Sequence, residues 1–154
     1  MMWTQKEASL LEELKSQEKL CIEKYGKYAQ QAKDPQLKQL FTQIQQTEQQ
    51  HQQTVNQMLQ GTIPQMNQQG GGQQQAPQGQ APAYGQQPSQ DKTDDAYLCQ
   101  DALGTEKHVS GVYNVNIFEF RSPQARDVLS HLQKEEQEHG QMIYAYMAQN
   151  GMYE

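Results

Sequence analysis

The sequence is poor in apolar residues and has no dense group of basic residues. Only 34% of its 154 residues are hydrophobic, and no stretch approaches the ~18 consecutive apolar residues that a membrane-spanning helix needs. The formal net charge is −6, and the lack of a lysine or arginine cluster argues against a surface that follows nucleic-acid phosphates. The first residues lack the basic stretch and apolar run of a signal peptide, which predicts a soluble protein made in the cytosol.

A segment with almost no large apolar side chains divides the chain into two arms. Residues 61–92 are rich in glutamine, glycine and proline, a composition that is typical of a disordered linker. The arms on either side, residues 4–60 and 93–150, both carry apolar residues at helical spacing. A chain of this length suits one compact domain rather than two, so residues 1–154 are expected to form a single domain.

The two arms repeat each other at an offset of 88 residues. The matching positions share residue types that carry chemistry or shape the backbone: Glu18 and Glu106, Tyr25 and Tyr113, Pro35 and Pro123, Glu48 and Glu136, and His51 and His139. Such a duplication indicates that each arm folds as the same unit.

Each arm has the start and stop signals of a helical hairpin. Residues that cap helix N-termini stand at three points: Thr4 with Glu7, Asp34 before Pro35, and Ser122 before Pro123. Gly61 and Gly151 mark the far ends. These signals predict helices near residues 4–31, 35–60, 93–120 and 123–149. We therefore predict an all-α, four-helix bundle of two helical hairpins, joined by a long flexible crossover that runs the length of the bundle.

In each expected helix the core-facing positions recur at alternating spacings of three and four residues. These positions are Leu11, Leu14, Glu18, Cys21, Tyr25 and Tyr28; Leu37, Phe41, Ile44, Glu48, His51, Val55 and Met58; Cys99, Ala102, Glu106, Val109 and Tyr113; and Ala125, Leu129, Leu132, Glu136, His139, Ile143 and Tyr146. An isolated ionised carboxylate is very costly in a low-dielectric interior, and no lysine or arginine shares these positions. Two divalent cations would balance the four glutamates, with both histidines neutral.

The spacing of the charged core-facing residues matches a dinuclear metal site. Each of the second and fourth expected helices carries a Glu-x-x-His pair, which places both side chains on one helix face. The remaining two glutamates each stand 30 residues before the pair of their own arm. One Glu from each of two helices plus Glu-x-x-His from each of the other two is the ligand pattern of di-iron and di-manganese carboxylate proteins. We therefore predict that two Fe or Mn ions are bound by Glu18, Glu48, His51, Glu106, Glu136 and His139.

Other residues near the predicted site leave alternatives open. Tyr25 and Tyr113 lie two turns beyond the glutamates of their helices, where a phenol can hydrogen-bond a bridging ligand, although core packing explains them equally well. Cys21 and Cys99 are expected to be buried, reduced thiols rather than a disulfide. Four further residues fall outside the core-facing positions and are expected to be solvated: His108, His131, Glu135 and Glu138.

The chain resembles the ferritin-like superfamily in the order of its site residues, Glu18 followed by Tyr25 and then Glu48-x-x-His51, repeated in the second arm. It also resembles the Coat F family, ferritin-like proteins of the bacterial spore coat. That second resemblance rests on the short arms, the glutamine-rich middle, and two segments, Glu106-Lys107-His108 and Phe120-Arg121-Ser122-Pro123-Gln124.

The Coat F resemblance implies a protein made in the mother cell of an endospore-forming bacterium and deposited on the spore coat. Its expected partners are other spore coat proteins, a homodimer is a further option, and neither nucleic acid nor a membrane is expected. A dinuclear Fe or Mn centre would fit an oxidase or peroxide-removing activity. Two alternatives stay open, a purely structural coat assembly protein with a structural or vestigial metal site, and an iron-storing cage.

Overall fold

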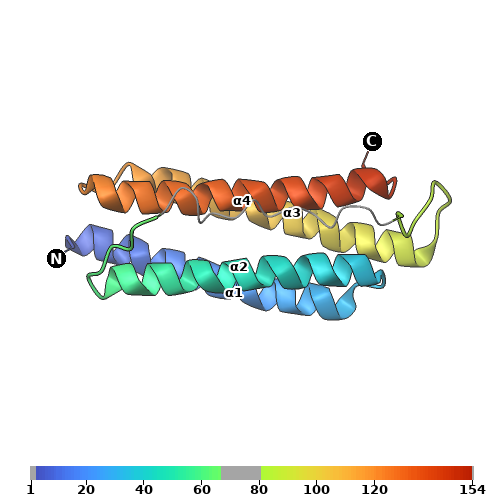
Figure 1. Ribbon diagram of the computed structural model, residues 1–154, viewed down its shortest axis with the longest axis horizontal. Helices are drawn as coiled ribbons and strands as arrows, with labels where there is room; N and C mark the ends of the chain where they lie inside the picture. The colour runs from blue at the N-terminus through green and yellow to red at the C-terminus, as the bar shows by residue number, and fades with distance from the viewer. Residues whose placement is uncertain (1–2, 67–80, 154) are drawn as a thin grey trace.

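The computed structural model describes residues 3–66 and 81–153, which form a bundle of four helices (Figure 1). The helices are α1 (Gln5–Gln31), α2 (Pro35–Leu59), α3 (Gln90–Ile117) and α4 (Pro123–Gln149). α1 packs along α2 and α3 packs along α4, so each arm is a helical hairpin and the two hairpins lie against each other. The predicted all-α architecture is confirmed. Residues 67–80 of the predicted linker lie outside the described residues.

Side-chain caps set where the helices begin. Thr4 and Ser122 accept backbone N–H groups of the first turns of α1 and α4, and Asp34 does the same for α2, as the sequence predicts. α3 begins at Gln90, earlier than the expected residue 93, because Ser89 Oγ accepts the N–H of Lys92 at 3.1 Å. α3 also ends earlier than expected, at Ile117, and residues 118–122 form the turn before α4.

The two glycines predicted at the far ends of the hairpins do terminate helices. Gly61 has a φ of 95° after α2, and Gly151 has a φ of 65° after α4. A side chain strains this left-handed backbone, which explains glycine at both positions.

An acidic residue from the first helix of each hairpin holds the turn of the other hairpin. Asp95 of α3 is fully buried, and its carboxylate accepts the backbone N–H groups of Lys33 and Asp34, at 2.8 and 3.0 Å, between α1 and α2. Its counterpart in the repeat, Glu7 of α1, is also buried and accepts Arg121 Nε at 2.7 Å in the turn between α3 and α4. These contacts fix the register of the hairpins, which in turn aligns the middles of all four helices.

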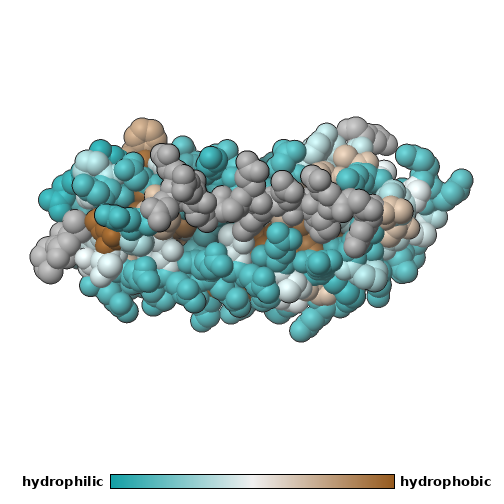
Figure 2. Space-filling model, viewed as in Figure 1, coloured by the Kyte–Doolittle hydropathy of each residue, from teal (hydrophilic) through white to brown (hydrophobic). Residues whose placement is uncertain are grey.

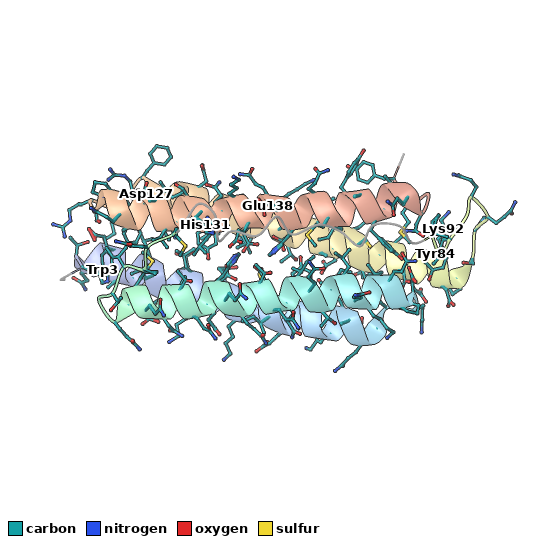
Figure 3. All side chains as sticks on the ribbon, in the orientation of Figure 1. Trp3, Tyr84, Lys92, Asp127, His131 and Glu138 are labelled. Carbon is teal, nitrogen blue, oxygen red and sulfur yellow. The ribbon has the colours of Figure 1, made fainter. Side chains whose placement is uncertain are left out.

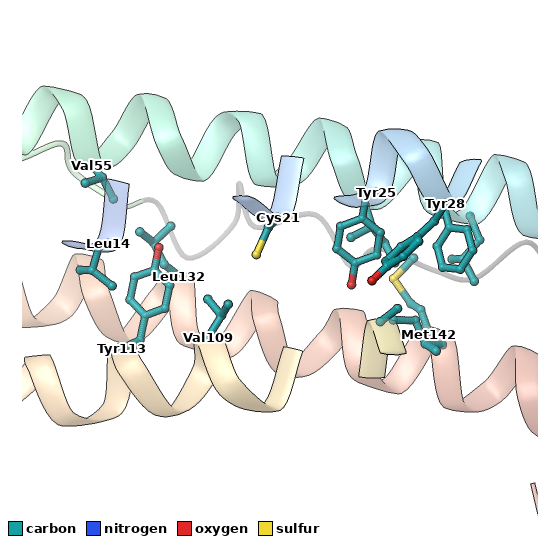
Figure 4. Packing of buried hydrophobic residues seen from close by; sticks show 14 of the residues in the cluster. Leu14, Cys21, Tyr25, Tyr28, Val55, Val109, Tyr113, Leu132 and Met142 are labelled. Carbon is teal, nitrogen blue, oxygen red and sulfur yellow. The ribbon is translucent and has the colours of Figure 1, made fainter. Parts of the chain in front are cut away.

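The core is formed by the predicted core-facing positions. Every position predicted to face the core is buried, and Figure 4 shows Leu14, Cys21 and Tyr25 of α1 pointing toward the opposite hairpin. Hydrophilic residues cover most of the face seen in Figure 2. Within the described residues, no helix combines the length and apolar character needed to cross a bilayer.

Candidate metal centre

All six predicted ligands lie near the midpoints of their helices and meet inside the bundle. α1 contributes Glu18, α3 contributes Glu106, and α2 and α4 each contribute a Glu-x-x-His pair. The carboxylates and imidazoles are shut off from solvent, and the most exposed of the six residues, Glu106, is only 3% exposed. The six polar side chains therefore lie at core-facing positions, in the part of the bundle that solvent does not reach.

The six side chains form two overlapping groups of possible metal ligands. One group is Glu18, Glu48, His51 and Glu136, and the other is Glu48, Glu106, Glu136 and His139; the ligand atoms within each group lie within 4.8 Å of one another. Glu48 and Glu136 belong to both groups. Because a carboxylate has two oxygens, these two residues could serve both groups, and each group would keep one further Glu and one His of its own.

Most of the polar atoms of this cluster have no hydrogen-bond partner among the described residues. The buried atoms without a partner include Glu18 Oε2, Glu48 Oε1 and Oε2, Glu106 Oε2, Glu136 Oε2, and both ring nitrogens of His139. Folded proteins rarely leave buried polar groups unpaired, because each costs about 1–3 kcal/mol and more when it is charged. Unpaired carboxylate oxygens, together with an imidazole that can present one lone pair, are the groups that bound cations would satisfy.

The two histidines differ in how firmly they are held. His51 Nδ1 lies 2.8 Å from Glu136 Oε1, and its Nε2 lies 2.9 Å from Glu135 Oε1. The Nδ1 atom of His139 is no closer than 3.4 Å to a carboxylate oxygen, that of Glu106, and neither ring nitrogen is hydrogen-bonded to another described residue. The rings lie nearly parallel, with centroids 5.9 Å apart.

Burial and mutual repulsion perturb the carboxyl groups strongly. Burial, followed by the charge of Glu136 and then of Glu18, raises the pKa of Glu48 well above its usual value. Burial and the neighbouring Glu106 likewise raise the pKa of Glu136. Burial acts in the same direction on Glu106, but interactions with Glu136 and His139 outweigh it and lower the pKa of Glu106. In the metal-free protein, burial and repulsion therefore favour the protonated forms of Glu48 and Glu136.

The pKa values of both histidines are raised as well, which favours the charged form of an imidazole. Burial alone would lower the pKa of His51, but its hydrogen bonds to Glu135 and Glu136 raise that pKa well above the usual value. Burial also opposes the charge on His139, and its interaction with Glu106 raises the pKa of His139. In the metal-free protein, imidazolium groups partly neutralise the surrounding carboxylates.

Tyr25 and Tyr113 connect the two hairpins through the predicted ligands. Tyr25 of α1 donates to Glu106 Oε1 of α3 at 2.5 Å, and Tyr113 of α3 donates to Glu18 Oε1 of α1 at 2.6 Å. Each tyrosine thus holds the glutamate of the opposite hairpin through Oε1, and the second oxygen, Oε2, of each carboxylate has no hydrogen-bond partner among the described residues. The sequence left core packing open as an explanation, and the structure adds a hydrogen bond to the packing.

Glu135 is the residue of the site that the sequence analysis missed. It was expected to be solvated, but its side chain is only 14% exposed and contacts His51 Nε2. His131, one turn earlier on α4, lies 3.4 Å from the same carboxylate oxygen, and Glu138 buries one unpaired oxygen (Figure 3). Glu135 directly precedes the core residue Glu136, so it borders the buried face of α4. This position in the sequence could have indicated that Glu135 is partly buried.

The two cysteines are free and buried, as predicted. Cys21 lies one turn after Glu18 on α1, and burial together with the charge of Glu48 raises the pKa of its thiol far above the usual range. Burial likewise raises the pKa of Cys99, which lies nearer the end of the bundle beside Asp95 and Asp34. Protonated thiols are poor metal ligands, so neither cysteine competes with the carboxylates and imidazoles.

The residues present fit two hard or borderline divalent cations. Four carboxylates offer a charge of −4, which two such ions balance, and the buried oxygens without partners would become ligands. Mixed carboxylate and imidazole donors favour Fe or Mn over a closed zinc site, which is typically built from thiolates and imidazoles. The ligand roles of the six residues, with Tyr25 and Tyr113 behind them, stay a prediction that metal analysis must test.

One comparison with known proteins gives a match. The family model described as the Coat F domain matches residues 94–154, which comprise nearly all of α3, the following turn and α4. No curated protein and no solved structure matches the chain significantly. The family match thus covers the second hairpin, whose ligand candidates are Glu106, Glu136 and His139.

Proposed function

We propose, from the match of residues 94–154 to the Coat F domain, that the chain is a spore coat protein that binds a pair of Fe or Mn ions. We further propose that the ion pair reacts with a small oxidant, either O₂ or peroxide, and so protects the spore. The bound ions would supply one-electron redox steps and open coordination positions. The ligands would be the six residues of the candidate centre.

The observation that carries the proposal is the set of unpaired buried ligand atoms. Three of the four glutamates have one oxygen without a hydrogen-bond partner among the described residues. In Glu48 both oxygens lack one, although Oε1 lies 3.0 Å from His51 Nδ1. A merely structural polar network would satisfy these atoms within the protein, because a half-satisfied network is less stable than an apolar core. Retaining four such carboxylates in the middle of the core makes physical sense when cations fill the gap.

The surrounding residues have defined tasks in this proposal. Tyr25 and Tyr113 hold the carboxylates of Glu106 and Glu18 in fixed orientations and pack against the cluster to exclude water. Glu135 accepts a hydrogen bond from the N–H group at His51 Nε2. This bond favours the tautomer in which Nδ1 would offer its lone pair to a metal. These contacts orient the ligands before an ion arrives.

Metal analysis of the full chain, purified without chelators, tests the proposal directly. We expect two Fe or Mn ions per chain, one for each ligand group, and loss of both from the double variant Glu48→Gln, Glu136→Gln. Glu13→Gln, at an exposed position of α1, is the matched control and should keep both ions. Protein loaded anaerobically should then change its absorption on exposure to O₂ or peroxide. Full occupancy without any spectral response would reject the redox role.

A structural role is the second candidate, and the origin of the ligands favours it. The six residues come from both hairpins, so bound ions would tie the hairpins together. In that case the double variant would impair folding or incorporation into the coat, whereas metal-loaded protein would show no reaction with O₂ or peroxide. Spores that carry the double variant separate the two roles, because the redox role predicts intact coats with lower peroxide resistance.

A further inference from the structure

A groove of about 490 Å³ opens between α3 and α4 directly over one half of the candidate centre. Glu106 and Glu136 belong to its lining, as do Leu103 and three residues with little or no side chain, Ser110, Gly111 and Gly140. A Cβ atom added at Gly111 would meet nothing within 4 Å, and one added at Gly140 would lie 3.6 Å from Leu103 Cδ1. The groove is therefore open because these positions lack side chains.

The first hairpin lacks small residues at three of the corresponding positions. The positions that correspond to Ser110, Gly111 and Gly140 in the first hairpin, 88 residues earlier, are Ile22, Glu23 and Gln52. All three carry side chains of several heavy atoms. The first hairpin has a glycine of its own on this face, Gly26, at the position that corresponds to Asn114. The space beside Gly26 is filled, because a Cβ atom added there would lie 2.7 Å from Gln45 Nε2, whereas one added at Gly111 would meet nothing.

The remaining lining suits a small anionic ligand. It includes the ammonium group of Lys107 and three neutral amides, Asn114, Gln133 and Gln137. The only carboxylates in the lining are those of Glu106 and Glu136, which are less than 4% exposed and whose charge bound ions would balance. A cation at the mouth favours the approach of anions, and amides can hydrogen-bond them without adding charge.

We propose that this groove is the entry route by which a small anion reaches the half of the centre formed by Glu106, Glu136 and His139. The inference rests on the proposed metal pair. Its independent support is that Glu106 and Glu136 each bury an oxygen with no partner among the described residues, next to the groove. Those oxygens are covered in the structure, so entry requires a small shift of the lining side chains.

Azide binding to the full chain loaded with Co²⁺ tests the route. Co²⁺ binds the same kind of carboxylate and imidazole donors and has visible absorption bands that respond to a new ligand. Gly140→Leu should fill the groove and slow azide association by at least about tenfold, since entry then requires a larger conformational change. Gly111→Leu, on the opposite wall, should act in the same direction. Both replace a helical glycine by a better helix former, which favours folding.

Gln52→Leu is the matched control, because it places the same residue, leucine, at the equivalent position of the first hairpin without adding a side chain to a glycine. It should leave azide association unchanged. Equal rates in wild type, Gly140→Leu and Gly111→Leu would overturn the route while leaving the metal pair intact, and so would an equal loss in Gln52→Leu. A wild-type chain that shows no Co²⁺ absorption bands would overturn the metal pair and the route together.

Discussion

Replacing Glu48 by glutamine should stabilise the metal-free protein while abolishing its response to metal. Glu48 is fully buried, and both of its oxygens lack a regular hydrogen bond among the described residues. Its one close polar contact is from Oε1 to His51 Nδ1 at 3.0 Å, and that nitrogen lies still closer to Glu136. Burying this ionisable group costs about 1–3 kcal/mol, and more when it is charged, and glutamine removes that cost at nearly constant volume because an amide does not ionise. For a chain of this size we expect the melting temperature of metal-free Glu48→Gln to rise by about 2–12 °C.

The pH dependence of this gain has a defined sign. Burial and the neighbouring carboxylates raise the pKa of Glu48 in the folded, metal-free protein. A carboxyl group with a raised folded pKa destabilises the protein once the pH exceeds its unfolded pKa of about 4.3, since the unfolded chain then releases the proton more readily. The advantage of Glu48→Gln should therefore be small near pH 4 and should grow toward pH 7.

Thermal unfolding followed by circular dichroism, with and without chelator, measures both effects. Wild type should gain stability when Mn²⁺ or Fe²⁺ is added, because an ion that binds only the folded state stabilises it by mass action. Glu48→Gln should lose most of that gain, and Glu13→Gln should behave as wild type. A metal-free Glu48→Gln protein that melts below wild type would refute the reasoning, because it would mean that the carboxylate is satisfied within the protein.

Two further substitutions test contacts around the centre. Glu135→Gln should weaken metal binding about 10–100-fold at the half that contains His51, since the amide holds the imidazole less strongly; chelator competition measures this, and unchanged affinity would contradict the role. Asp95→Ala should lower the free energy of unfolding by about 2–5 kcal/mol, because the N–H groups of Lys33 and Asp34 lose their acceptor. Urea titration measures the loss, with the exposed Asp127→Ala as control (Figure 3), and equal values for both variants would argue against it.

Local sequence signals predicted the helices and the composition of the cluster well. The helix starts follow from side chains adjacent in sequence, such as Asp34 before Pro35, and these caps act over two or three residues. The core seams follow from helical periodicity, which places Glu48 and His51 on one face whatever the partner helix. Because the repeat puts the charged pair at the same point of both hairpins, alignment of the helices brings the four glutamates together.

Helix caps and helical periodicity do not predict the contacts between the two hairpins. Glu135 lies at the border of the buried face of α4, and only the position of α2 decides that it meets His51 and not water. Tyr25 donates a hydrogen bond to Glu106, and Asp95 accepts one from the turn after α1. Both depend on the register of one hairpin against the other. Periodicity describes a single helix, so it identifies which residues are buried but not what they touch.

The duplication has produced a centre with two unequal halves. Thr47 stands in the first hairpin where Glu135 stands in the second, so the repeat supplies a carboxylate for the Nε2 atom of His51 alone. Gly140 and Gly111 line the groove beside Glu106 and Glu136, and Gln52 and Glu23 stand at the corresponding positions of the first hairpin. In the proposed ion pair, the half with the supported histidine would therefore be suited to retain its ion, and the half next to the groove would be suited to exchange ligands. A symmetric pair of hairpins would give both ions the same affinity and the same access, and it is the departures from the repeat that allow the two positions to differ in chemistry.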